Sequence, residues 1–326
     1  MTVQLKRFTD EQRIALTKQL STIISNPYSQ YYEFKDEVKD LTQTLPDFIH
    51  QLCDSIVNDR KIDERAHFIR NCPIDINAEK FDPTNPSVDK YQKKKTFIGE
   101  TFLQVFAELT GTPIFRYTTD SNFFKDVYGL IQSNPLSNEI CLQKLVWHND
   151  ATYNKIMPDY ITLLGMRAYK ENKVYTSLID SREIMMHLDQ ETQRNLRRNY
   201  YATPAKNCAF DSNSIEEHPI LIESKLRYCS SVTQCAPESP VEAKDALIAL
   251  ETAIMKSSIK RFIIGDRDLL NIPNKHYLHN REAIQVNNIE EAYHRWLLKT
   301  SHLQNPDKVE GSKVFFVHRD SIVIKN

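Results

Sequence analysis

Apolar residues in the first third of the chain recur at helical spacing. Three segments show this pattern clearly: 10–25, 45–59 and 99–111. Asp10 is the expected N-cap of the first helix, and Gly111 is a suitable residue to end the third. Residues 71–96 are rich in Pro, Asp and Asn and lack periodicity, which predicts a long surface loop. We therefore expect a helical N-terminal scaffold over about residues 1–110.

Short runs rich in β-branched and aromatic residues begin near residue 111 and predict strands. The expected strands cover 113–117, 126–132, 140–147, 159–169, 173–179, 260–265, 295–300 and 313–318. Helical patterns at 181–198 and 240–258 interrupt them, which predicts a helical insertion over about 180–258. The order of elements predicts an α+β chain in which a β core over about 111–326 is flanked by helices. Residues 1–326 are expected to form one domain.

The composition is that of a folded globular protein and excludes several classes of function. Of 326 residues, 40% are apolar and 26% are charged, with a net charge of −1. Because acidic and basic residues are interspersed, nothing favours a nucleic-acid or membrane partner. The six glycines form no phosphate-binding loop, and the six cysteines form no C-x-x-C pair and are expected to be reduced. Without a long apolar stretch or signal-peptide pattern, a cytoplasmic protein is expected.

Three His-x-Asp pairs are candidates for part of a metal site, although a chain of this composition should contain roughly one such pair by chance. The pairs are His148/Asp150, His187/Asp189 and His318/Asp320. The second pair falls in a helical pattern, where residues two apart do not face each other. The third is followed by no histidine that could complete a site in the usual order. In an extended segment the first pair would point to one side, so a metal site completed by a histidine from residues 261–284 is expected there.

The segments around the first pair resemble the clavaminate synthase-like branch of the iron(II)/2-oxoglutarate-dependent oxygenases. The resemblance rests on "WHND", "PDYITLLGMRAY", "YTSLIDSREI", "GDRDLLNIPNKHYLHNR" and "HRWLLKT", and extends from about residue 98 to about residue 300. It implies a double-stranded β-helix (jelly-roll) core. It also implies Fe(II), 2-oxoglutarate and O2 as cofactors, and a small molecule as the substrate.

The resemblance also assigns roles to individual residues. It implies that His148, Asp150 and His279 are the iron ligands, because "LHNR" is similar to the family's "xHGR" with Asn280 in place of glycine. His276 is the rival third ligand, but on an extended strand it would face away from His279. Two further residues are expected to bind the far carboxylate of 2-oxoglutarate: Arg295, through its two-pronged guanidinium, and Thr176, through its hydroxyl.

The residues expected to bind the primary substrate are Lys299 and Arg227. Lys299 stands where this branch often has a second arginine for the substrate's carboxylate, and Arg227 resembles a recurring family arginine. Cys229 stands where an acidic residue is common. A basic substrate would need a carboxylate partner, for which the candidates are Asp120, Glu139 and Asp211.

The resemblance implies hydroxylation of an unactivated C–H bond of a free amino acid, of the lysine, arginine or ornithine type. Asp150 favours hydroxylation over halogenation, because a halogenase of this class must leave a coordination position free for chloride. Three alternatives remain open: the same cofactor chemistry on a carrier-tethered or non-amino-acid substrate, with desaturation or cyclisation possible; a zinc-dependent hydrolase; and a non-catalytic metal-binding relative. The sequence predicts no oligomeric state.

Overall fold

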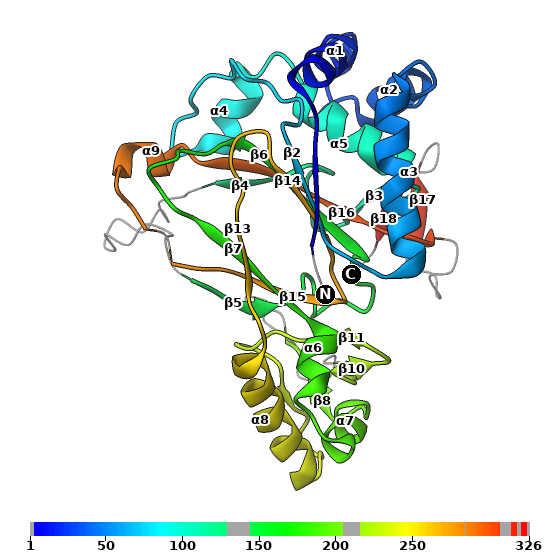
Figure 1. Cartoon of the computed structure of the whole chain (residues 1–326), viewed down its shortest axis with the longest axis vertical. Coiled ribbons are helices and arrows are strands. Elements are labelled where there is room, and N and C mark those ends of the chain that lie inside the picture. The colour runs from blue at the N-terminus through cyan, green and yellow to red at the C-terminus, as the bar shows by residue number, and fades with distance from the viewer. Residues whose placement is uncertain are drawn as a thin grey trace.

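A computed structural model describes residues 3–128, 144–204, 216–283, 285–306, 314–317 and 321–324. The helices are α1 (Asp10–Leu20), α2 (Tyr31–Thr42), α3 (Asp47–Ile62), α4 (Pro86–Lys93), α5 (Ile98–Leu109), α6 (Ser181–Met186), α7 (Gln190–Leu196), α8 (Val241–Lys256) and α9 (Ile289–Tyr293). Two sheets lie between the N-terminal helices and the helices of the insertion (Figure 1).

The larger sheet joins strands from both ends of the chain. Its order is β1 (Gln4–Arg7), β2 (His67–Arg70), β14 (Leu269–Pro273), β6 (Tyr160–Arg167), β16 (Trp296–His302), β3 (Ile114–Tyr117), β18 (Ser321–Ile324) and β17 (Val314–Val317), and β4 (Lys125–Tyr128) also pairs with β16. The β1–β2 and β3–β18 pairs are parallel, and the other pairs are antiparallel. Residues 1–110 therefore supply two strands of this sheet as well as the helices expected from their sequence.

The smaller sheet carries the segments that the sequence singles out. Its order is β13 (Lys260–Ile263), β7 (Tyr175–Asp180), β15 (Tyr277–Arg281) and β5 (Leu145–His148), with every neighbouring pair antiparallel. The remaining short strands belong to or adjoin the insertion: β8 (Tyr201–Ala202), β9 (Glu217–His218), β10 (Leu221–Ile222), β11 (Lys225–Leu226) and β12 (Gln234–Cys235).

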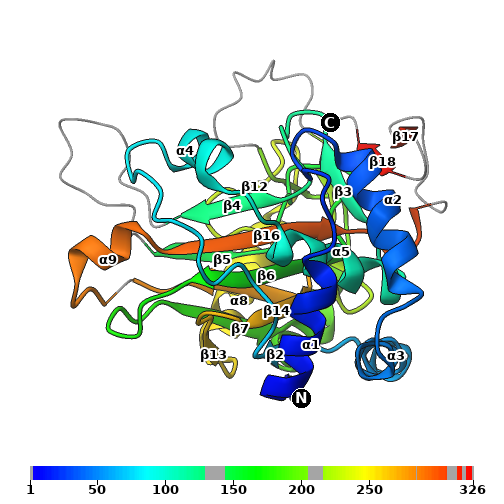
Figure 2. The ribbon, with the colours of Figure 1, turned by 90° about the horizontal axis from the view of Figure 1, so that it is seen from above.

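Alternating side chains on the central strands build three layers of core. On β16, Trp296 and Leu298 pack against the N-terminal helices, whereas Leu297 packs between the two sheets. On β7, Leu178 lies between the sheets and Ile179 packs under α6 and α8. This period of two explains why the central strands are apolar on both faces. Figure 2 shows the same layers from above.

Helix α5 is fixed at its N-terminus by a buried carboxylate. Asp75 accepts hydrogen bonds from the backbone N–H groups of Ile98 and Gly99, both at 3.1 Å. It therefore satisfies N–H groups of the first turn that have no partner within the helix. A Cβ at Gly99 would lie 2.6 Å from Met166 Cε on β6, so glycine allows the helix to lie close to the sheet. Gly111 has φ of +62° and ends the helix as the sequence predicts.

Several elements differ from the sequence-based expectations. Thr9, not Asp10, caps α1, because its hydroxyl and the Gln12 side chain form a reciprocal capping box. The expected loop 71–96 contains α4, and α2, β1, β2 and β18 are among the elements not expected from the sequence. His187 and Asp189 lie in the turn between α6 and α7, where Asp189 caps α7. The pair His318/Asp320 lies outside the described residues.

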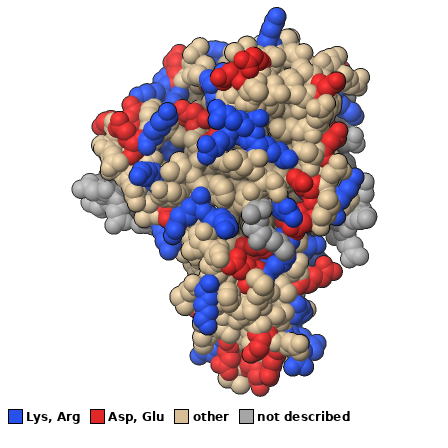
Figure 3. All heavy atoms as spheres, in the orientation of Figure 1, with Lys and Arg blue, Asp and Glu red and all other residues tan. Residues whose placement is uncertain are grey.

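The structure also bears on the composition-based expectations. Among the helices that the structure describes, none is both long and apolar enough to span a bilayer. The described cysteines, Cys53, Cys72, Cys229 and Cys235, are free, as expected. On the face shown in Figure 3, basic and acidic side chains are interspersed.

Candidate active site

His148 is positioned by an irregularity at the end of β5. His279 lies opposite His148 but Arg281 lies opposite Leu145, so two residues of β5 face the single residue Asn280. This bulge leaves the Val146 carbonyl 2.8 Å from His148 Nδ1. Because a carbonyl only accepts hydrogen bonds, Nδ1 carries the proton and the lone pair of Nε2 remains available for a metal.

Asp150 reaches the same place through a turn rather than through the pleat of a strand. β5 ends at His148, so the expectation of one extended segment from 148 to 150 is wrong. Asn274 holds the turn from both sides: its Oδ1 accepts from the backbone N–H of Asp150 at 2.8 Å, and its Nδ2 donates to the Asp150 carbonyl at 3.2 Å. Ala151 follows with φ of +57°, which sharply redirects the chain.

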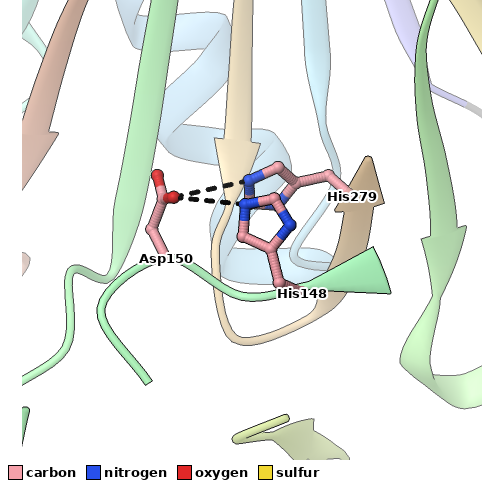
Figure 4. A group of neighbouring side chains, drawn as sticks. All are labelled: His148, Asp150 and His279. Carbon is pink, nitrogen blue, oxygen red and sulfur yellow. Dashed lines mark ion pairs between the residues drawn. The ribbon is translucent and has the colours of Figure 1, made fainter. Parts of the chain in front are cut away.

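The side chains of His148, Asp150 and His279 converge (Figure 4). Asp150 Oδ1 lies 3.5 Å from His148 Nε2 and 3.7 Å from His279 Nε2. One potential ligand atom from each residue falls within a group spanning at most 4.8 Å. Burial and the neighbouring His148 lower the pKa of His279 to about 4, so its imidazole is neutral at physiological pH, as a metal ligand must be.

His276 does not join this group. It lies in the turn between β14 and β15, where its backbone N–H donates to the Pro273 carbonyl and its carbonyl accepts from Ser181. Burial lowers the pKa of His276 to about 4. Of the two candidate third ligands, only His279 lies beside His148 and Asp150.

Lys299 contacts the carboxylate of Asp150. On β16, Lys299 lies on the inner face with Leu297, and its Nζ is 2.5 Å from Asp150 Oδ2. Burial by itself would raise the pKa of Asp150, but the Lys299 ammonium holds it well below its usual range. Asp150 is therefore ionised, with Oδ1 toward the histidines and Oδ2 toward Lys299.

A cavity of about 100 Å³ connects this group to Arg295 and Thr176. Arg295 immediately precedes β16, is 5% exposed, and has no ion-pair partner in the described part of the chain. Its Nη1 also has no hydrogen-bond partner among the residues that the structure describes. Burial, and secondarily the charge of Arg281, lower the pKa of Arg295 to about 10, so it is still a cation at neutral pH. Thr176 on β7 is buried and lies opposite Arg281.

Arg227 lies elsewhere. Its Nε donates to the Thr152 carbonyl at 2.8 Å, and its Nη2 pairs with Glu216 at 3.3 Å. It therefore supports the turn that follows Asp150 and is absent from the described lining of the cavity. Of the candidate acidic partners for a basic substrate, Asp120 pairs with Lys125 at 2.6 Å, and Glu139 and Asp211 lie outside the described residues.

Sequence reasoning missed the residues that support the site. Asn149 accepts from the Tyr228 backbone N–H and donates to the carbonyls of Asn274 and Tyr277. No local pattern marks these long-range contacts. Arg281 also lines the cavity, and its position two residues after His279 could have identified it, because both side chains face the same side of β15.

The donor set fits a divalent transition metal. Two imidazoles and one carboxylate that can bind on one face of an ion, leaving the other positions open, are the usual ligands of non-haem iron(II). Catalytic zinc uses the same set, so the three ligands alone do not choose the metal. The buried guanidinium of Arg295 in the same cavity indicates that an anionic molecule binds beside the metal.

Comparison with known proteins identifies similar sequences and folds. No family model matches the chain. Clavaminate synthase 2 of Streptomyces clavuligerus is 23% identical over 191 residues, 57% of this chain, and the match spans about half (56%) of that relative's length. An asparagine oxygenase in complex with Fe(II), 2S,3S-3-hydroxyasparagine and succinate superimposes with a TM-score of 0.78 at 16% identity, covering 99% of both chains.

A second structural neighbour is the non-haem iron oxygenase OrfP. Its complex with Fe, succinate and (3S)-hydroxy-L-Arg has a TM-score of 0.75 at 17% identity and covers 99% of this chain and 100% of that one. The chain thus has the mixed α/β fold of these iron oxygenases, and its resemblance to the clavaminate synthase-like branch is confirmed.

Proposed function

We propose that this chain is an iron(II)/2-oxoglutarate-dependent oxygenase with a double-stranded β-helix core that hydroxylates a free amino acid. The observation that carries the proposal is Arg295, a buried cation without a counter-ion in the described structure, in one cavity with the candidate metal ligands. An unpaired buried charge is costly, so it is retained where a ligand supplies its partner.

His148, Asp150 and His279 hold the iron(II) in this proposal. When bound, the iron, 2-oxoglutarate and O2 supply the oxidising chemistry, with succinate as the co-product. The protein's part is to fix the ligand geometry: the Val146 carbonyl orients one imidazole, and Asn274 clamps the turn that carries the carboxylate.

Arg295 and Thr176 receive the far carboxylate of 2-oxoglutarate in this proposal. A guanidinium offers two parallel donors that match a carboxylate, and the threonine hydroxyl adds a third. Beside the polar residues of the cavity, its lining includes the apolar side chains of Val127, Ile161, Leu163 and Leu297, which limit the access of water. In that setting the charge-assisted hydrogen bonds are strengthened.

The same residues oppose the two rival functions. A zinc hydrolase needs the three ligands and a water but has no use for a buried arginine in the metal cavity. A non-catalytic relative would not need to keep both the metal ligands and an anion-binding arginine beside them. Binding of 2-oxoglutarate and its conversion to succinate separate the three functions.

An amino-acid substrate is supported by the structural neighbours. The asparagine oxygenase complex contains 3-hydroxyasparagine, and OrfP structures contain hydroxylated arginine or L-canavanine. For this chain, we infer a free amino acid, of the basic type expected from the sequence. A carrier-tethered substrate is the alternative, with Lys299 as the candidate contact in either case; Arg227, expected from the sequence to share this role, lies outside the described lining of the cavity.

Succinate formation from 2-oxoglutarate, with iron(II) and O2, tests the proposal across a panel of free amino acids beginning with lysine, arginine and ornithine. We expect one amino acid to stimulate succinate formation and to gain one oxygen atom by mass spectrometry. The Arg295→Met variant is the control and should lose the stimulation. Failure of the metal-loaded wild-type protein to bind 2-oxoglutarate would overturn the proposal.

A further inference from the structure

The two oxygens of Asp150 have different partners. Oδ1 faces both imidazole Nε2 atoms, at 3.5 and 3.7 Å, whereas Oδ2 contacts Lys299 Nζ at 2.5 Å. A metal-binding carboxylate can use one oxygen or both, and the choice decides how many positions remain on the ion. The ammonium occupies the oxygen that a second coordination bond would need.

Lys299 is held firmly enough to perform this task. It lies in the middle of β16, which is paired on one side with Leu163 of β6 and on the other with Lys125 of β4. Its side chain is 24% exposed, compared with 15% for Asp150, so solvent only partly screens the contact. The turn carrying Asp150 is fixed independently by Asn274.

This inference rests on the oxygenase function proposed above. We propose that Lys299 is a positioning residue, which pairs with Oδ2 of Asp150 and so prevents that oxygen from binding the metal. It keeps the carboxylate a one-oxygen ligand and leaves a metal position open for the co-substrate. This role differs from the one expected from the sequence, in which Lys299 binds the carboxylate of the primary substrate.

The two roles predict different consequences for the Lys299→Met variant, in which a neutral chain of similar length replaces the lysine. With Oδ2 released and a neighbouring cation removed, Asp150 can bind a divalent ion through both oxygens. Mn²⁺ alone should then bind about tenfold more tightly, since an ammonium on the same carboxylate repels the ion. In the Mn²⁺-loaded variant, 2-oxoglutarate should bind about tenfold more weakly, because one position is filled and one cation is lost.

Isothermal titration calorimetry of the full chain measures both affinities without turnover, first with Mn²⁺ and then with 2-oxoglutarate. Lys125→Met is the matched control. It removes a lysine of similar exposure from the neighbouring strand, together with a 2.6 Å ion pair to Asp120, and leaves Asp150 untouched. We expect the control to bind Mn²⁺ and 2-oxoglutarate like the wild type.

Three results would overturn the inference. The first is unchanged Mn²⁺ and 2-oxoglutarate affinity in Lys299→Met, which would leave Lys299 only a role in binding the primary substrate. The second is weaker Mn²⁺ binding in that variant. The third is an equal effect in Lys125→Met, which would indicate a general loss of positive charge. Failure of the oxygenase function is distinguishable, because the wild-type protein itself would then not bind 2-oxoglutarate.

Discussion

Buried charges lie on both faces of β16, but they are satisfied in different ways. On the outer face, near Trp296, Lys94 pairs with Asp75 at 2.7 Å and with Glu100 at 3.1 Å. In the same region Lys90 pairs with Asp126, whose other oxygen accepts from Trp296 Nε1 at 2.8 Å. On the inner face, Arg295 has no such partner in the described structure.

The difference separates a structural charge cluster from a binding site. Inside a protein, a cation with its carboxylates fixed nearby costs little to keep, and removing one partner leaves the others unsatisfied. A buried cation without a partner destabilises the fold until a ligand binds. We therefore interpret the outer cluster as support for α4 and α5, and Arg295 as the anion-binding group of the site.

The largest effect is expected from a substitution that breaks the outer cluster. Lys94→Met leaves Asp75 and Glu100 as buried carboxylates without their ammonium, so the free energy of unfolding should fall by about 3–5 kcal/mol. Urea denaturation at neutral pH measures it. A loss below the effect of an exposed pair such as Lys80/Glu291, typically about 0–1 kcal/mol, would contradict the structural role.

The same substitution on the inner face should act in the opposite direction. Arg295→Met removes an unpaired buried cation and replaces it with an apolar chain, so the free energy of unfolding should rise by about 1–3 kcal/mol in the absence of ligand. Urea denaturation of the ligand-free variant beside Lys94→Met gives the comparison directly. If both variants lose stability equally, Arg295 is part of the scaffold and the distinction between the two faces fails.

Buried neutral histidines extend the comparison to groups that titrate. His302 lies between the Thr300 hydroxyl and the Thr112 carbonyl, and burial lowers its pKa to about 4. Between pH 6.5 and about 4 the unfolded chain binds a proton there that the folded chain does not, so stability falls as pH falls through this window. His302→Gln should reduce that slope by up to about 1.4 kcal/mol per pH unit. The free energy of unfolding is measured from pH 7 to 4 for both proteins. Curves for the wild type and the His302→Gln variant that remain parallel would contradict this.

The smallest expected effect concerns Thr176. Thr176→Val keeps the shape but removes the hydroxyl, and a single hydrogen bond contributes about 0.5–1.5 kcal/mol. The affinity for 2-oxoglutarate should therefore fall about three- to tenfold, with little change in folding stability. A calorimetric titration of the metal-loaded variant checks this, and Thr162→Val, a buried threonine of β6 that is bonded to Asn271, is a control for loss of a hydroxyl.

The sequence indicated the site because the site residues lie in short segments with a recognisable pattern. His148/Asp150 and the "LHNR" and "HRWLLKT" segments carry side chains whose types and order are legible without a structure, and the structure brings all three segments to one cavity. The roles of these residues stay predictions until metal and co-substrate binding are measured.

What could not be predicted depends on distant contacts. The turn that positions Asp150 is held by Asn274, which is 124 residues away in the sequence. The pairing of Lys299 with Asp150 depends on how the two sheets pack face to face. β1 and β2 are short and are stabilised by pairing with each other, and β2 also pairs with β14. Local propensity carries no signal for such pairings.

The most direct test of the account is a calorimetric titration of 2-oxoglutarate into Mn²⁺-loaded wild-type protein and into the Arg295→Met variant. The account predicts metal-dependent binding in the wild type and an affinity about thirty- to hundredfold lower in the variant, the effect of losing a charge-assisted pair. Equal affinity in the two proteins, or no binding to the wild type, would contradict it.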